Sequence, residues 1–363
     1  MTRLATYLLM GAGLAIGGGA AQSQQELVID FDAGRTIIND PWRAILWRAA
    51  IDHERGIFYV RDSEEPEGIL AFSLLTGERV QTFLAPTGDG PKELPEGVRS
   101  VSVAPDGRVY IAGMVRVVEY TQQGEYLGAW TPNAPARRDG SVCDFGGQPA
   151  VPVVGGVLRR GDDGSADMGI GSNVLMLGSD PDEWIEMEGI TDRVWNVGAA
   201  RILCTPDAAF VVLEHSDKTD SLFVYYRASN REGRLPIPTE LAADQALTVG
   251  PLLETDGRGH VVLLGVSFIT LLDRPGGFTA VGAVLDPATG CHGVIRNPEP
   301  NMLQPTFQGI YQDSALVAYR YREEGRENGR LVRTTHTYSN RVALHPLRRI
   351  SGQPCPGMLP TVN

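Results

Sequence analysis

Short runs of apolar residues, each entered through a polar turn, recur along the chain at a period of about 50 residues. Each turn carries Asp, Gly or Pro, as in Pro105-Asp106-Gly107, and each run is rich in the β-branched and aromatic residues typical of strands. The runs lie at residues 57–60, 109–111, 210–212, 261–263 and 316–318, with a weaker copy at 157–158. No long apolar pattern with the helical period separates them, so the sequence predicts an all-β chain built from repeats.

A second pattern follows each copy, and it is typical of two strands joined by a tight polar turn. Six such hairpins are expected at residues 70–80, 118–128, 175–185, 224–235, 284–294 and 335–343. An alternating strand precedes several of the turns, as at residues 98–104 and 200–204. Each period therefore holds about four short antiparallel strands.

Repeated four-stranded units of this kind predict a six-bladed β-propeller, in which each sheet buries both faces against its neighbours. A β-sandwich is the competing fold, but its strands do not repeat at a near-constant period. We expect a single domain over residues 24–363 with a short C-terminal tail, and residues 25–31 should close the ring by pairing with the last blade. Residues 342–347 compete for the same position, so the closing arrangement stays open.

One copy of the repeat carries a more specific motif, spread over residues 88–98, 103–112 and 115–127. This copy resembles an NHL-type repeat of secreted bacterial six-bladed propellers. The other copies keep only the turn and the apolar strand. The resemblance implies the propeller fold, but it does not choose among functions, because such propellers include binding platforms, sensor domains, lyases and lactonases.

The N-terminus indicates export. One basic residue precedes an apolar run over residues 4–16, and small residues follow, so residues 1–23 are expected to be a signal peptide cut after Ala21 or Ser23. An uncleaved membrane anchor is the alternative, disfavoured because the run is short and diluted by glycine compared with the ~20 apolar residues of a span. We therefore expect a periplasmic or secreted protein with no membrane span after cleavage.

Four cysteines fit two disulfides in such an oxidising compartment, with three pairings possible. We predict a bond between Cys143 and Cys204, which lie in the innermost strands of consecutive blades. The second predicted bond joins Cys291 to Cys355, where the C-terminal tail crosses an outer strand. None of the four has the spacing of a metal site.

The chain is acidic, with 44 Asp and Glu against 32 Lys and Arg, a net charge of −12 and a pI near 5.0. This charge opposes attraction to phosphate backbones and anionic lipids. Nucleic acid is therefore not an expected partner, whereas a protein, peptide or glycan ligand is compatible with the composition.

Familiar catalytic motifs are missing, and the six histidines are scattered singly. In a propeller, ligands are expected over the channel, at the loops that leave the second strand of each blade. Three blades have a charged residue at this position and three have glycine. The predicted ligand-binding residues are Asp62, Glu214 and Arg320 with the neighbouring Arg61, Trp195 and His215. Turns such as Pro105-Asp106-Gly107 are expected on the opposite face, where they should tolerate substitution.

Two classes of function remain. The first is a secreted or periplasmic binding or scaffold protein that recognises a protein, peptide or glycan around the channel. The second is a metal-dependent lyase or lactone hydrolase, in which carboxylates hold a divalent cation such as Ca²⁺. Such sites need ligands from at least three blades, and only Asp62 and Glu214, with Asn196 as a third candidate, occupy comparable positions. Binding is therefore the favoured function, and no catalytic residue is assigned.

Overall fold

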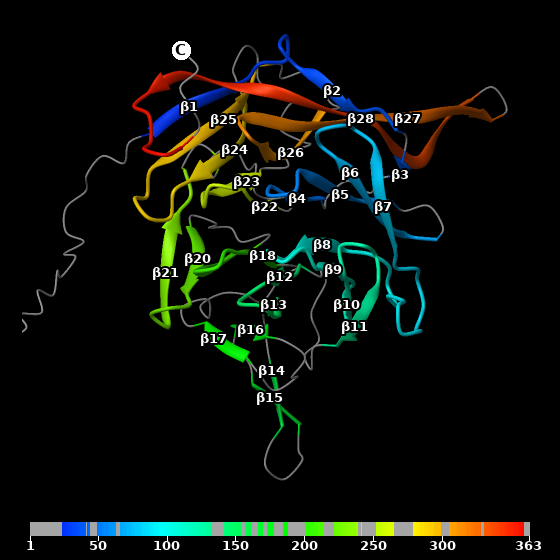
Figure 1. Ribbon diagram of the computed structural model, residues 1–363, viewed down its shortest axis with the longest axis vertical. Coiled ribbons are helices and arrows are strands. Elements are labelled where there is room, and N and C mark those ends of the chain that lie inside the picture. Colours follow the sequence, from blue (N-terminus) through cyan, green and yellow to red (C-terminus); the bar gives the residue numbers. More distant parts are fainter. Residues whose placement is uncertain are drawn as a thin grey trace, which may run out of the picture.

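The computed structural model shows an all-β chain. It describes residues 24–40, 42–43, 49–62, 66–131, 141–153, 157–160, 166–169, 173–177, 184–187, 200–213, 221–238, 241, 252–264, 279–298, 305–327 and 330–358. Apart from Leu241, which is helical, the secondary-structure elements in these residues are β-strands, and the strands form sheets around a central axis (Figure 1). The all-β prediction is confirmed, and the arrangement is propeller-like.

Four sheets have four antiparallel strands each. The first contains β4 (Ala49–Asp52), β5 (Ile57–Asp62), β6 (Gly68–Ser73) and β7 (Arg79–Leu84). The second contains β8 (Ser100–Val103), β9 (Val109–Ala112), β10 (Val117–Tyr120) and β11 (Tyr126–Trp130). The third contains β12 (Cys143–Asp144), β13 (Pro149–Val153), β16 (Asn173–Leu177) and β17 (Trp184–Met187). The fourth contains β18 (Ala200–Cys204), β19 (Ala208–Leu213), β20 (Ser221–Tyr226) and β21 (Arg231–Pro236).

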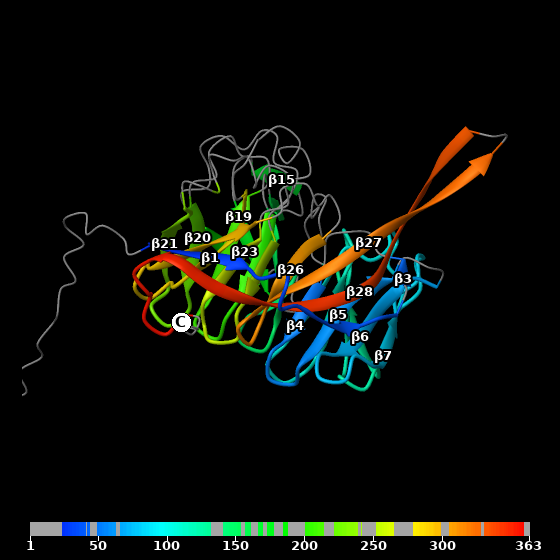
Figure 2. The same ribbon diagram turned by 90° about the horizontal axis from the view of Figure 1, so that it is seen from above.

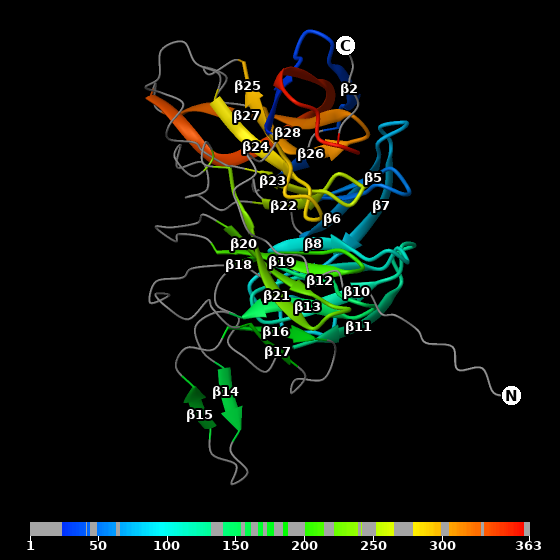
Figure 3. The same ribbon diagram turned by 90° about the vertical axis from the view of Figure 1, so that its left-hand side faces the viewer.

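A separate hairpin interrupts the third sheet. It pairs β14 (Val157–Arg160) with β15 (Ala166–Gly169), and Figures 1 and 3 show it apart from the four-stranded sheets. The weaker copy of the repeat at residues 157–158 therefore lies in this hairpin and not in a four-stranded sheet. The second strand of the third sheet is β13 instead.

Two further meanders belong to one ten-stranded sheet. The first contains β22 (Leu252–Thr255), β23 (Val261–Leu264), β24 (Thr279–Leu285) and β25 (His292–Asn297). The second contains β26 (Pro305–Tyr311), β27 (Ser314–Glu327) and β28 (Arg330–Gly352), and Figure 2 shows β27 and β28 extending beyond the sheets as a long hairpin. Strand β1 (Gln24–Ile29) joins the two meanders, pairing in parallel with β25 and antiparallel with β28.

The N-terminal segment closes the structure with two strands. The predicted pairing of residues 25–31 with the last meander is confirmed by β1, but β1 does not form that meander's fourth strand. That position belongs to β2 (Arg35–Ile38), which pairs with β28 beside β3 (Trp42–Arg43). Residues 342–347 do not compete with β1, because the 23-residue β28 is long enough to pair with β27 and β2 first and with β1 afterwards.

Apolar side chains from neighbouring sheets form the core. Between the first and second sheets, for example, Tyr59 and Phe83 pack in one buried cluster with Val101 and Ile111. The first strands contact one another in the order β4, β8, β12, β18, β22 and β26, and β26 contacts β4 again. This closed circuit of first strands surrounds a central channel.

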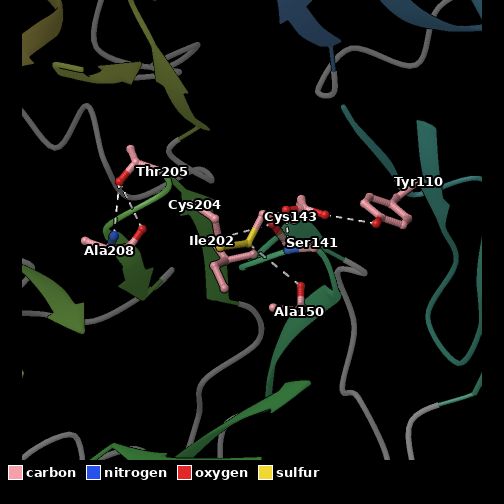
Figure 4. Close-up of a disulfide and its surroundings, with 10 residues drawn as sticks. Tyr110, Ser141, Cys143, Ala150, Ile202, Cys204, Thr205 and Ala208 are labelled. Carbon is pink, nitrogen blue, oxygen red and sulfur yellow. Dashed lines mark hydrogen bonds between the residues drawn. A yellow bond between two sulfur atoms is a disulfide. The ribbon is translucent and has the colours of Figure 1, made fainter. Parts of the chain in front are cut away.

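Both predicted disulfides are present. Cys143 of β12 is bonded to Cys204 of β18, so the bond joins the first strands of the third and fourth sheets (Figure 4). Beside it, the backbone N–H of Ile202 donates to the hydroxyl of Ser141 at 3.1 Å. The second bond, between Cys291 and Cys355, fixes the C-terminal tail next to β25.

Candidate functional site

A cavity of about 880 Å³ runs along the central channel. Five first strands line it, namely β4, β8, β12, β18 and β22. One end lies where these strands begin, at residues such as Ala49, Ser100 and Arg201. The other end lies at the turns that follow the strands, where Pro105 and Pro206 line it. A cavity of this size accommodates a small molecule.

Glu254 places a carboxyl group in the cavity wall. It is the third residue of β22, and the backbone N–H of Thr255 donates a hydrogen bond to its carboxylate. Burial raises the pKa of Glu254 from the ordinary 4.5 to about 8, and the hydrogen bond offsets this only in part. A carboxyl group that titrates near neutral pH inside a cavity is characteristic of functional sites.

Strand β26 approaches Glu254 at Gly309. A Cβ atom at Gly309 would lie 4.0 Å from Cγ of Glu254 and only 2.8 Å from Cδ1 of Ile51. Position 309 therefore has to lack a side chain for Ile51 to lie where it does. The approach of this bare backbone helps to enclose the carboxyl group.

Glu254 is not among the residues that the sequence pattern predicts for the site. A signal was available, because Glu254 is a single charge in the short first strand Leu252-Leu253-Glu254-Thr255, next to the predicted turn at residue 256. In a half-buried strand, side chains face the core and the solvent in turn, so a single charged residue is equally compatible with a position facing solvent. The pattern alone could therefore not assign Glu254 to the channel.

His53 lies across the turn end of the cavity. Its Nε2 donates to the carbonyl oxygen of Thr255 at 2.9 Å, and its ring stacks on Tyr311 with 6.1 Å between ring centroids. Burial lowers the pKa of His53, and the hydrogen bond and the charges of Asp256 and Asp52 oppose this effect. The imidazole is therefore neutral at pH 7 and forms a bridge between two sheets that are not consecutive along the chain.

Arginine side chains join consecutive turns around this end of the channel. Arg55 pairs with Asp52 at 3.1 Å and donates to the carbonyl oxygen of Pro105 at 3.3 Å, which links the first sheet to the second. Arg108 links the second sheet to the third. Its carboxylate partners are Asp106 and Glu119, each at 2.7 Å, and Asp144 at 3.5 Å. These ion pairs fix the turns that line the cavity mouth.

The structure describes three of the six predicted ligand-binding residues, and none of the three lines the cavity. Asp62 is the last residue of β5 and is partly buried. Arg61 pairs with Glu67 at 2.9 Å, which gives it a structural partner. Arg320 lies in β27 opposite Ser339. The remaining three, Trp195, Glu214 and His215, lie outside the described residues.

The expectation for the first-strand turns needs correcting. Pro105 and Asp106 follow β8, at the end of the sheet away from Asp62, yet both line the cavity. The reason is that the cavity extends along the full length of the first strands, so its walls include the turns at their ends. Substitution at these turns is therefore no longer expected to be neutral for binding.

Within the described ranges, no group of three or more His, Cys, Asp or Glu side chains is arranged to hold a metal ion. The candidate metal ligands Glu214 and Asn196 lie outside those ranges. The described residues also contain no helix that is long and apolar enough to cross a membrane.

No protein-family model matches the chain, and no curated protein matches it either. Among solved structures, the RRP9 WD40 repeats are 11% identical with a TM-score of 0.47, covering 88% of this chain and 99% of that one. A putative exported protein from Bacteroides fragilis is 9% identical with a TM-score of 0.47, covering 91% and 99%. Regucalcin, a calcium-binding protein from Agrobacterium tumefaciens, is 13% identical with a TM-score of 0.41, covering 88% and 96%. These neighbours are β-propeller proteins. The propeller-like arrangement of this chain rests on its own strand pairing and not on these similarities.

Proposed function

We propose that the chain is a six-bladed β-propeller with NHL-like repeats that binds a small ligand in its central channel. The circuit of six first strands supports the blade number, because each of them begins a meander. Five meanders have four strands of their own, and β2 completes the sixth as the outer strand beside β28.

The observation that carries the proposed binding function is the cavity that contains Glu254. Enclosing a carboxyl group costs free energy, and a purely structural channel would be more stable with an apolar residue at that position. The ligand would recover this cost by pairing with the carboxyl group. No observation in the described residues favours a hydrolase or lyase reaction over binding.

An oxidising compartment, either the periplasm or the extracellular space, is the proposed location. The apolar segment at residues 4–16 and the two disulfides both support it. The predicted site, with Asp62, Glu214, His215 and Arg320, stays a proposed contact region for the ligand or for a protein, peptide or glycan partner.

A thermal-shift screen of a small-molecule library against the mature protein tests this function. Ser102 of β8 lines the cavity, so Ser102→Phe fills part of it while Ser102→Ala leaves it open. Compounds that bind in the channel should stabilise the wild type and the Ala variant and should lose their effect on the Phe variant. If no compound stabilises the wild type more than it stabilises Ser102→Phe, the channel is not the binding site.

A further inference from the structure

The carboxyl group of Glu254 has little hydrogen bonding of its own. Its donor is the backbone N–H of Thr255, and within the described part of the chain no Lys or Arg side chain pairs with it. An ionised carboxylate offers about four acceptor positions. Most of its accepting capacity is therefore available to a molecule in the cavity.

The surrounding wall is mixed in character. Ile51 of β4 and Leu253, which precedes Glu254 on β22, are buried apolar residues that line the cavity. Ser102 lines the same cavity, as does Thr205, whose hydroxyl is hydrogen-bonded to the backbone of Ala208. The wall thus combines the carboxyl group of Glu254, turn aspartates that are already paired with arginines, a few neutral acceptors and an apolar surface. Apolar walls with a few polar groups are the usual composition of a small-molecule site.

We propose that the ligand carries a protonated amine, which pairs with Glu254 while the rest of the molecule contacts the apolar wall. This inference rests on the proposed function, because it requires a ligand in the channel. An ammonium group has three N–H donors and no acceptor, and the carboxylate and hydroxyl oxygens of the cavity are acceptors of the required kind.

The charges on neighbouring elements are compatible with a cation at this position. Asp256 follows Glu254 on the same segment, and the first sheet contributes Asp52 and the neutral His53. Strand β26 has no ionisable side chain before Tyr311. Strand β18 contributes Arg201 to the cavity wall, and this guanidinium is not among the groups that shift the pKa of Glu254.

Binding of an amine is coupled to proton release. With the pKa of Glu254 raised to about 8, the carboxyl group of the empty cavity is mostly protonated at pH 7. A protonated amine pairs with the ionised form, so the proton of Glu254 passes to the buffer and the ligand keeps its own. Amine affinity should therefore increase as the pH rises from about 6 to about 8.

Three probes of similar shape but different charge test the inference: benzylamine, benzyl alcohol and benzoate. Isothermal titration calorimetry of the mature protein at pH 7, in two buffers with different ionisation enthalpies, gives both affinity and protons released. We expect benzylamine to bind with a Kd on the order of 1 mM. It should bind at least about tenfold more tightly than benzyl alcohol, because only the amine forms a charge-assisted hydrogen bond.

Two variants of the same chemical type separate the site from general charge effects. Glu254→Gln should abolish both the preference for the amine and the release of protons. Glu125→Gln is the matched control, because Glu125 is an exposed glutamate in the turn between β10 and β11, outside the cavity lining, and should leave both unchanged.

Three results would overturn the inference. They are equal affinity for benzylamine and benzyl alcohol, benzylamine binding that Glu254→Gln leaves unchanged, and no benzylamine binding at about 10 mM. These results leave the proposed function to its own test. If Ser102→Phe abolishes binding of the neutral probe, or of a compound from the library screen, the proposed function stands and only the inference of an amine ligand fails.

Discussion

Replacing Glu254 by Gln should stabilise the protein at neutral pH. The side chain of Gln has nearly the same shape and keeps an oxygen that accepts the hydrogen bond from Thr255. The variant removes only the need to hold an ionisable group in an enclosed position. An increase in stability on removal of a native carboxyl group is unusual, so the expected sign is informative by itself.

The magnitude follows from the pKa of Glu254, which rises from 4.5 to about 8 on folding. Below pH 4.5 the carboxyl group is protonated in both the folded and unfolded states, and it costs nothing. As the pH rises further, the unfolded state ionises while the folded state stays protonated, so stability falls by about 1.4 kcal/mol per pH unit. The loss reaches about 3 kcal/mol at pH 7 and levels off above pH 8, once the folded state also ionises.

Urea unfolding of both proteins from pH 4 to pH 8 measures this difference. The free energy of unfolding of Glu254→Gln should equal that of the wild type near pH 4 and exceed it by about 3 kcal/mol at pH 7. Other titrating groups are common to both proteins, so their contributions cancel in the difference. A difference below about 1 kcal/mol at every pH would refute the reasoning, since it would mean that the carboxyl group is hydrated as in an unfolded chain.

Three further predictions concern the framework around the channel. The double substitution C143A/C204A should lower the free energy of unfolding by about 4 kcal/mol, from the chain entropy of a bond between residues 61 apart, as measured by urea titration. The hydrogen bond that Nδ1–H of His260 donates to the carboxylate of Asp256 raises the pKa of His260. The stability from this pair should therefore be full just below pH 6.5 and decline as the pH rises through the folded pKa. Asp256→Asn should remove that decline, and an NMR titration of His260 should then give a lower pKa. Arg108→Ala should lower the free energy of unfolding by about 2 kcal/mol in the same urea assay, because it leaves three carboxylates without their shared guanidinium. An unchanged unfolding midpoint would show that solvent replaces the guanidinium as the partner of these carboxylates.

Much of the sheet structure could be predicted from the sequence, because each strand carries a local signal. The turn at Pro105-Asp106-Gly107 leads into a buried apolar strand, and this short-range pattern fixes β9. Closure could not be predicted in the same way. Strand β2 has four residues, two of them exposed, and its partner near Leu344 lies some 300 residues away in the sequence.

The channel site depends on contacts between distant segments, so the sequence did not reveal it. His53 and Thr255 are 202 residues apart, and only the closed ring brings them together. The pKa of Glu254 depends on enclosure by strands that are distant in the sequence, including the bare backbone at Gly309. The disulfides were predictable because only three pairings were possible and the repeat placed Cys143 and Cys204 on consecutive first strands.

The most direct test of a ligand site in the channel is a crystal structure of the mature protein with benzylamine. We predict a ring of six four-stranded sheets, with the amine nitrogen about 2.8 Å from a carboxylate oxygen of Glu254. Benzylamine bound only outside the channel, or a channel filled by protein side chains around Glu254, would contradict the proposed site.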